Sequence, residues 1–282
     1  DDGSSDNTYK IAETYRMKDS RIKVFRKENG GQSSARNLGL KRMTGSLFLY
    51  VDSDDEVMPE MIERLYKRMS EEKADISMCG MICKTEKNET RKYCDAEILL
   101  LGRDEIIRQF LAEKFAYGPV CKLFRAEIFG KIPFKEGIIF EDIEYLSRVY
   151  LESNSICTCD YPGYIFWIRS ESTTHSKFDD KKLDLLKVTE MISQRIQSEN
   201  IVCDKEMMLF VLNSYLSILL MAADSGDYRR HAEVCRPLTA WIRENRSNIR
   251  RNELISERKK LYTYVFRMNN LLLINLLAFI RR

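Results

Sequence analysis

Four acidic side chains gather in VDSDDE at residues 51–56. Residues 46–50 before them form a nearly continuous apolar run, typical of a strand that is covered on both faces. In an open α/β sheet, ligands bind outside the carboxyl ends of the strands, so these carboxylates should face the ligand crevice. Carboxylates this close repel one another, and a bound divalent cation is the simplest way to stabilise them. The DXD pattern of Asp52 and Asp54 predicts a metal site, although an Asp-rich turn before a helix fits the same residues.

Two other aspartate motifs do not fit this segment. In an EF-hand loop a glycine follows the third acidic position, whereas Val57 follows Glu56 here. Phosphatases with an aspartate nucleophile carry Thr or Val four residues after the first aspartate, and Glu56 stands at that place. Both classes are therefore excluded.

The composition of the chain excludes further classes of protein and of binding site. A chain of 282 residues with 44% hydrophobic and 32% charged residues is typical of a soluble globular protein, and its net charge of +3 gives no argument for a nucleic-acid partner. Eight cysteines without a repeated CxxC pair, and two histidines, argue against zinc and predict free thiols in a reducing compartment. The apolar run at 271–280 is about half of the ~20 residues that a membrane span needs. We expect this run to form a buried terminal helix, and the second interpretation is a contact with a membrane surface.

The periodicity of the apolar residues predicts the order of the elements. Strands and helices alternate as far as residue 83, which predicts an α/β fold with a mostly parallel central sheet and flanking helices. The expected elements are a helix at 7–18, a strand at 21–25, a helix capped by Ser33 or Ser34 and running toward Met43, a strand at 46–52, a helix from Pro59 to Glu72 and a strand at 74–83. The later ones are a helix from about Arg103, an acidic helix at 141–151, β-like runs at 155–160 and 163–169, and helices thereafter.

Several short motifs occur together in a fixed order. They are Asp1-Asp2-Gly3-Ser4, Asn29-Gly30-Gly31, Ala35-Arg36-Asn37 with Gly39, Asp52-Ser53-Asp54-Asp55, Lys122-Leu123, Phe134, Gly137, Glu141-Asp142 and a Tyr164 to Ser172 segment. In this combination the chain resembles the family 2 glycosyltransferases, inverting enzymes of the Rossmann-like GT-A fold that build bacterial surface polysaccharides. The resemblance covers residues 1–175, and residues 176–282 are expected to form a helical C-terminal extension.

The resemblance implies a donor site for a nucleotide-diphosphate sugar, most directly a UDP-sugar. Asp2 would contact the uracil base, and Arg36 would meet the nucleotide nearby. Asp52 would lie by the ribose and the metal, and Asp54 would bind Mn²⁺ or Mg²⁺ against the diphosphate. Arg169 would offset charge on the leaving phosphates. On the residues alone, Asp2 could instead cap a turn, and Arg36 could be a solvated cation on a helix.

The resemblance also implies a catalytic base in FEDIEYL at 140–146. Transfer with inversion requires one group that takes the proton from the attacking hydroxyl, and Asp142 matches the family's base. Glu141 and Glu144 flank it, so a helix with a solvated acidic face is the structural alternative. The acceptor would be a saccharide or a lipid-linked saccharide, in the cytoplasm or at the inner face of the membrane, with possible peripheral membrane contact through the C-terminal helices.

The opening sequence DDGSSDNT bears on activity. In the family this loop ends the second strand of a nucleotide-binding βαβ unit, so we expect a preceding strand, helix and strand of roughly 30 residues. A domain without them could be a non-catalytic nucleotide-sugar-binding or scaffold domain. This is the alternative to the metal-dependent glycosyltransferase, and the sequence does not name the sugar, the acceptor or the linkage.

Overall fold

The computed structural model describes residues 1–93, 96–168, 178–225, 228–268, 272–274 and 277. Within these residues the strands are β1 (Leu47–Leu49), β2 (Glu56–Val57), β3 (Ile76–Lys84), β4 (Glu89–Lys92), β5 (Leu99–Leu101), β6 (Lys122–Arg125) and β7 (Ser155–Trp167). The helices are α1 (Thr8–Lys18), α2 (Gln32–Arg42), α3 (Met61–Glu72), α4 (Arg103–Leu111), α5 (Ala126–Phe129), α6 (Glu141–Leu151), the 3₁₀ turn η2 (Asp180–Leu183), α7 (Asp184–Ser198), α8 (Asp204–Asp224), α9 (Ala232–Glu244), α10 (Arg246–Arg251) and α11 (Glu257–Met268).

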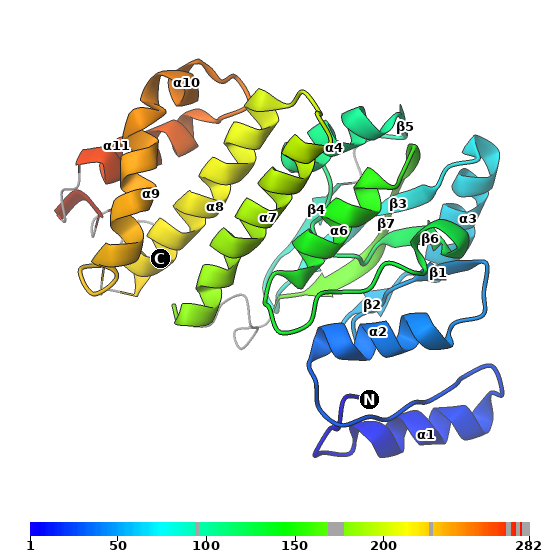
Figure 1. The fold of residues 1–282 in the computed structure, drawn as a ribbon. Coiled ribbons are helices and arrows are strands. Elements are labelled where there is room, and N and C mark those ends of the chain that lie inside the picture. The colour runs from blue at the N-terminus through cyan, green and yellow to red at the C-terminus, as the bar shows by residue number, and fades with distance from the viewer. Residues whose placement is uncertain (94–95, 169–177, 226–227, 269–271, 275–276, 278–282) are drawn as a thin grey trace.

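The sheet has the strand order β1-β6-β3-β7-β2, with β4 beside β3 and β5 beside β7. The predicted α/β class and the helical C-terminal region are confirmed (Figure 1). The strand directions are mixed rather than mostly parallel, because among the described ladders only that of β3 with β7 is parallel. The predicted strands β1 and β3 do run in the same direction. However, β6 lies between them and is antiparallel to both.

Three local predictions differ from the structure. Residues 21–25 do not form the predicted strand. Their backbone meets Asp1 through only two hydrogen bonds, from Asp1 N to Phe25 O and from Lys27 N to Asp1 O, which are too few for a β-ladder. Helix α2 begins after Gly31, whose φ of 85° favours glycine, rather than at either predicted serine cap. The two β-like runs after residue 154 are one strand, β7, whose pairing with β3 shifts register around Gly80.

Alternating side chains of β3 point to opposite faces of the sheet and enter two cores. On one face, Cys79 and Met81 pack in a cluster with Met61 and Leu65 of α3. On the other face, the core is built on α4 and α6, which Figure 1 shows in front of the sheet. Strand β1 lies at an edge of the sheet and its residues are only half-buried, so the full covering of both faces that the apolar run at 46–50 predicts is not found.

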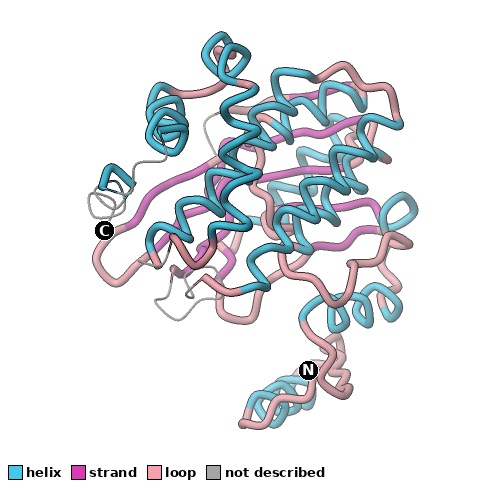
Figure 2. The backbone as a smooth tube through the Cα atoms, turned by 60° about the vertical axis from the view of Figure 1, so that its left-hand side comes forward, coloured by secondary structure: helices cyan, strands magenta, loops and turns pink. Residues whose placement is uncertain are grey.

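The helices after residue 180 continue outward from the second core. Val188 and Ile192 of α7 and Phe210 of α8 belong to the same cluster as the side chains of α4 and α6. A further cluster joins α8 to α9 and α11. Figure 1 shows α7, α8 and α9 in turn beside the sheet, and the tube in Figure 2 shows helices lying over the strands. The boundary at residue 175 stays a prediction, and the apolar core runs across it.

Helix α8 is the one helix of the described residues that is long and apolar enough to cross a membrane, with a mean hydropathy of 1.7. More than half of its most apolar window, 56%, is buried inside the protein. Core helices pass the same test of length and composition, so α8 is best described as a core helix. The run at 271–280 lies mostly outside the described residues.

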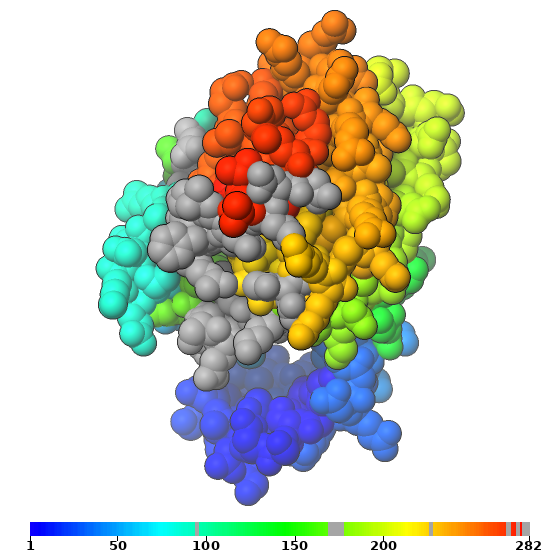
Figure 3. Space-filling view, turned by 90° about the vertical axis from the view of Figure 1, so that its left-hand side faces the viewer, coloured from blue at the N-terminus to red at the C-terminus, as the bar shows by residue number. Residues whose placement is uncertain are grey.

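The N-terminal helix α1 packs loosely against the rest of the protein. Figures 1 and 3 show the N-terminal residues at the edge of the molecule, and Figure 1 shows α2 between α1 and the sheet. Helix α1 has no buried residue, and Ile11 and Tyr15 are each 56% exposed. Helix α2, in contrast, buries Ser33 and Asn37 against the rest of the protein. It is α2 that carries the site described next.

Candidate active site

Arg36 connects three carboxylates that come from two distant parts of the chain. Its Nη2 donates to Asp52 Oδ1 at 2.9 Å. Its Nη1 donates to Asp142 Oδ1 at 2.5 Å and to Glu141 Oε1 at 3.4 Å. Only 9% of the Arg36 side chain is exposed, and its guanidinium lies 5.1 Å from the centre of the Phe134 ring. Asp52, at the end of the predicted strand, and Asp142, the predicted base, therefore share the guanidinium of Arg36.

The charges of this cluster do not balance. Three carboxylates around one guanidinium carry an excess of two negative charges when all are ionised. Burial raises the pKa of Asp142 to about 7, and the nearby Arg36 offsets this only in part. Burial opposes the charge of Arg36, but Asp142 and Asp52 outweigh it and raise the Arg36 pKa. Near neutral pH, Asp142 can therefore both accept and release a proton.

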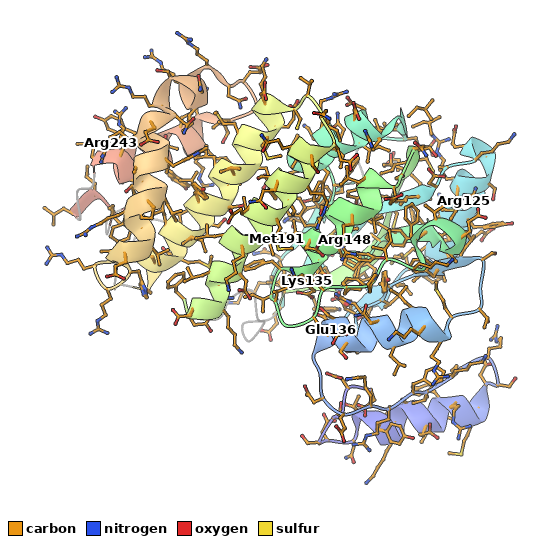
Figure 4. All side chains as sticks on the ribbon, in the orientation of Figure 1. Arg125, Lys135, Glu136, Arg148, Met191 and Arg243 are labelled. Carbon is orange, nitrogen blue, oxygen red and sulfur yellow. The ribbon has the colours of Figure 1, made fainter. Side chains whose placement is uncertain are left out.

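The loop before α6 sets the position of Asp142, and Asn37 holds that loop. Asn37 Nδ2 donates to the Phe134 carbonyl at 3.0 Å and to Glu136 Oε1 at 2.9 Å, and its Oδ1 accepts from Phe134 N at 2.7 Å. Figure 4 shows Glu136 on this loop, near α2. Phe140, the residue before α6, has φ of 65°, a strained value for a bulky residue. The sequence contained Asn37 within a motif but gave no indication of this clamping role.

Aromatic side chains form the floor under the guanidinium. Phe134 stacks on Tyr145 of α6 with ring centres 3.9 Å apart and an interplanar angle of 12°. The hydroxyls of Tyr145 and Tyr50 lie 3.2 Å apart. This packing keeps solvent from one side of Arg36, which strengthens its ion pairs.

A second network holds the acidic loop against β7. The Tyr164 hydroxyl accepts from Asp52 N at 3.1 Å and donates to Asp55 Oδ2 at 2.9 Å. Asp55 Oδ1 accepts from Trp167 N at 3.0 Å. Burial raises the Asp55 pKa, and these hydrogen bonds act against the rise. Asp55 thus holds the loop against β7. Asp52, in contrast, pairs with Arg36, and Asp54 is exposed.

Asp2 lies beside the turn that starts α2. Its carboxylate accepts from Gly30 N at 3.0 Å, from Gly31 N at 2.6 Å and from Lys27 Nζ at 2.7 Å. Although burial acts to raise it, these hydrogen bonds hold the Asp2 pKa below its ordinary value. These contacts agree with the alternative interpretation, in which Asp2 caps a turn. The contact of Asp2 with uracil stays a prediction.

Two other groups near the site have structural roles. Glu144 is buried and pairs with Arg148 at 2.7 Å and with Arg195 at 2.9 Å, so it links α6 to α7 and does not form a solvated acidic face with Asp142. Lys122 is buried, and its Nζ donates to the carbonyls of Ala116 and Gly118. Burial lowers the Lys122 pKa to about 8.

A cavity of about 1060 Å³ opens beside Asp142. Its walls come from the start of α2, the loop and first turn around 137–143, η2 and one face of α8. The base candidate is therefore at the junction of the Arg36 cluster and a space large enough for a substrate.

Comparison with known proteins agrees with this geometry. Residues 1–132 match the model of glycosyl transferase family 2. This match covers just under half of the chain. The chain is 30% identical over 190 residues to glycosyltransferase GlyG of Streptococcus pneumoniae serotype 4, covering 64% of this chain and 63% of that protein. It is 31% identical over 182 residues to the uncharacterized glycosyltransferase EpsJ of Bacillus subtilis, covering 61% of this chain and 52% of EpsJ.

Solved structures give the fold of the family 2 domain. The S. aureus TarS fragment 1–349, crystallised in complex with UDP-GlcNAc, aligns with a TM-score of 0.60 and 21% identity, over 98% of this chain and 79% of that one. The likeness confirms a GT-A-like fold. Because the chain spans less than two thirds of GlyG and EpsJ, the activity, substrates and partners of the whole protein are treated below as proposals.

Two predicted ligand contacts need separate mention. Arg169 lies outside the described residues, as do Ser172 and His175. For the metal, no group of three or more His, Cys, Asp or Glu side chains is placed to hold an ion in the described part of the chain. Asp54 and Asp52 nevertheless fit Mn²⁺ or Mg²⁺, because such ions are commonly bound by one or two carboxylates together with substrate phosphates and water.

Proposed function

We propose that this chain is an inverting glycosyltransferase. It transfers a sugar from a nucleotide-diphosphate sugar, most directly a UDP-sugar, to a saccharide or lipid-linked acceptor in cell-surface polysaccharide synthesis. The observation that carries the proposal is the Arg36 cluster, which brings the strand-end Asp52 and the buried Asp142 to one cation. The TarS structures with UDP-GlcNAc and UDP support uridine as the nucleoside of the donor.

The reaction is a single displacement. The acceptor hydroxyl attacks the anomeric carbon, its proton passes to a carboxylate oxygen of Asp142, and the bond from the anomeric carbon to the diphosphate breaks as the nucleotide leaves. A general base works best when its pKa lies near the working pH. The Asp142 pKa of about 7 meets this condition, and Arg36 and the clamped loop keep the carboxylate in one orientation.

Asp54 and Asp52 are the residues that would hold Mn²⁺ or Mg²⁺ in this proposal. When bound, the ion neutralises charge on the leaving diphosphate. Asp54 is exposed at the end of the loop, where a donor diphosphate can reach it. Asp52 is kept beside it by Arg36 and by the Tyr164 hydroxyl.

Replacing Asp54 with alanine is expected to remove the metal dependence of donor binding. Calorimetric titration of UDP, with and without Mn²⁺, measures this directly. The wild-type protein should bind UDP at least tenfold more tightly with Mn²⁺, a difference of about 1.4 kcal/mol, and Asp54→Ala should lose that gain. The exposed Asp160 gives a matched control, because Asp160→Ala removes one carboxylate elsewhere on the surface.

Each failure of this titration has a separate meaning. Wild-type metal dependence in Asp54→Ala would refute the metal assignment. Absence of UDP binding in the wild type would refute the uridine donor and favour a non-catalytic scaffold domain.

We also propose that the protein works in the cytoplasm and contacts the inner face of the membrane through its C-terminal helices. The exposed Leu261, Tyr264 and Met268 of α11 support this proposal, as does the basic pair Arg281-Arg282 in the sequence. Co-sedimentation with vesicles that contain anionic lipid should bring a substantial fraction of the protein into the pellet, and less at high salt. Protein that stays wholly in the supernatant would contradict the proposal.

A further inference from the structure

The cavity beside Asp142 has a second wall that the donor site does not use. This wall is one face of α8, whose cavity-lining residues recur at helical spacing: Phe210, Asn213, Ser214, Ser217, Leu220, Met221 and Asp224. Tyr117 lines the cavity beside this face, with its ring centre 6.4 Å from that of Phe210. Asn213 lies three residues beyond Phe210 and therefore on the same side of the helix.

Polar atoms of this wall have no hydrogen-bond partner within the described residues. Both amide atoms of Asn213, Nδ2 and Oδ1, are buried and unpaired, and so is the Tyr117 hydroxyl. Burying a polar group without a partner destabilises a protein, so native proteins pair nearly all such groups with protein, water or ligand. An amide that can both donate and accept, next to a phenol and a cavity, is suited to bind hydroxyl groups.

The other groups in the cavity indicate the charge of the ligand. Most carboxylates of the lining are already ion-paired within the protein: Glu113 with Lys259, Asp184 with Lys187, and Glu141 and Asp142 with Arg36. A lining whose charges are mostly paired within the protein offers little net charge to a charged ligand, and it favours an uncharged one. Apolar and aromatic surface from Phe140, Phe210 and Leu220 lies between these groups, and such surface packs against the apolar faces of sugar rings.

We propose that this cavity is the acceptor subsite and that it binds an uncharged saccharide, with Asn213 and Tyr117 hydrogen-bonding its hydroxyls. The inference rests on the proposed glycosyl transfer. It assigns acceptor selection to the helical extension, because Asn213 lies on α8. It also selects a neutral sugar chain over a phosphate-containing one.

The test is saccharide binding to the full chain in the presence of UDP and Mn²⁺, so that no turnover occurs. Saturation-transfer NMR would use maltotriose, cellotriose and chitotriose as neutral probes and dextran sulfate as the charged probe. At least one neutral probe should bind. Asn213→Leu and Tyr117→Phe should each weaken its binding about tenfold, with UDP affinity unchanged.

Thermal stability separates ligand binding from an internal structural role. Because the Asn213 amide has no protein partner, Asn213→Leu should leave the melting temperature unchanged or raise it. Asn252→Leu is the matched control, since Asn252 is buried and its amide bonds Lys205 O at 2.8 Å and Leu254 N at 2.9 Å. That variant should melt lower and bind the saccharide as the wild type does.

The outcomes distinguish this inference from the function on which it rests. Failure of the wild type to bind UDP would remove the proposed function itself, and this inference with it. With UDP bound, three results would overturn the acceptor subsite alone: wild-type saccharide affinity in Asn213→Leu, binding of dextran sulfate in preference to the neutral probes, or no binding of any neutral probe.

Discussion

Asp142→Asn is expected to lower sugar transfer by a factor of about 10²–10⁴, the usual contribution of a general base. Asparagine is close to aspartate in shape and its Oδ1 still accepts from Arg36, so UDP should bind as before. It cannot take the proton of the acceptor hydroxyl at neutral pH. Transfer rates measured with saturating donor, beside UDP titration of the same variant, check both statements. Full transfer by Asp142→Asn would refute the assignment of the base.

The same substitution should stabilise the fold at alkaline pH. The folded-state pKa of Asp142, about 7, is above its ordinary value of 3.8, so the folded protein binds more protons between about pH 4 and 7. The stability from this group is present below pH 4 and is lost as the pH rises through 7. Asp142→Asn should therefore melt higher than the wild type at pH 8.5 and show little difference at pH 4.5.

The pH dependence of transfer provides an independent check on Asp142. Because the base must be ionised, the wild-type rate should rise with pH through a midpoint near 7. Asp160→Asn, which removes an exposed carboxylate of β7, should change neither the rate nor the melting temperature. A rate that is flat between pH 5.5 and 8.5 would contradict a base with this pKa.

Arg36→Met is expected to be the most destabilising single change in the site. It removes the guanidinium that Asp52, Glu141 and Asp142 share, and uncompensated buried charges typically cost about 3–5 kcal/mol. The loss in the free energy of unfolding, measured by urea denaturation, should be larger at pH 8 than at pH 5, because acid neutralises the carboxylates. Transfer should fall with it, since Asp142 and Asp52 lose their common anchor.

Two further variants make the Arg36 prediction specific. Arg21→Met removes an exposed arginine that pairs only with Asp19 in the described contacts, and should change stability by under about 1 kcal/mol. The double variant Arg36→Met with Asp142→Asn should recover part of the lost stability, because one of the unpaired charges is gone. If Arg36→Met and Arg21→Met lowered the free energy of unfolding equally, the Arg36 cluster would contribute nothing to stability.

The sequence determined the features that depend on local patterns. The apolar run at 46–50 and the helical spacing of Met61, Leu65 and Met69 follow from side chains a few residues apart, and both elements are present in the structure. The order of the motifs was enough to predict the likeness to glycosyl transferase family 2, whose model matches residues 1–132. Asp52 was singled out by its place at the end of a predictable strand, and Asp142 by its match to the Glu-Asp pair of the resembled family.

The tertiary structure decided every feature that depends on which distant segments meet. Strand β6 enters the sheet between β1 and β3, and this made the sheet mixed. Residues 21–25 have strand-forming side chains but no neighbouring ladder, so local propensity did not suffice. Glu144 and Asp142 are two residues apart on α6, yet one faces α7 and the other faces Arg36. The single ion cluster at Arg36 forms only when α2 and α6 pack together, because charge pairing and desolvation are set by spatial neighbours rather than by sequence neighbours.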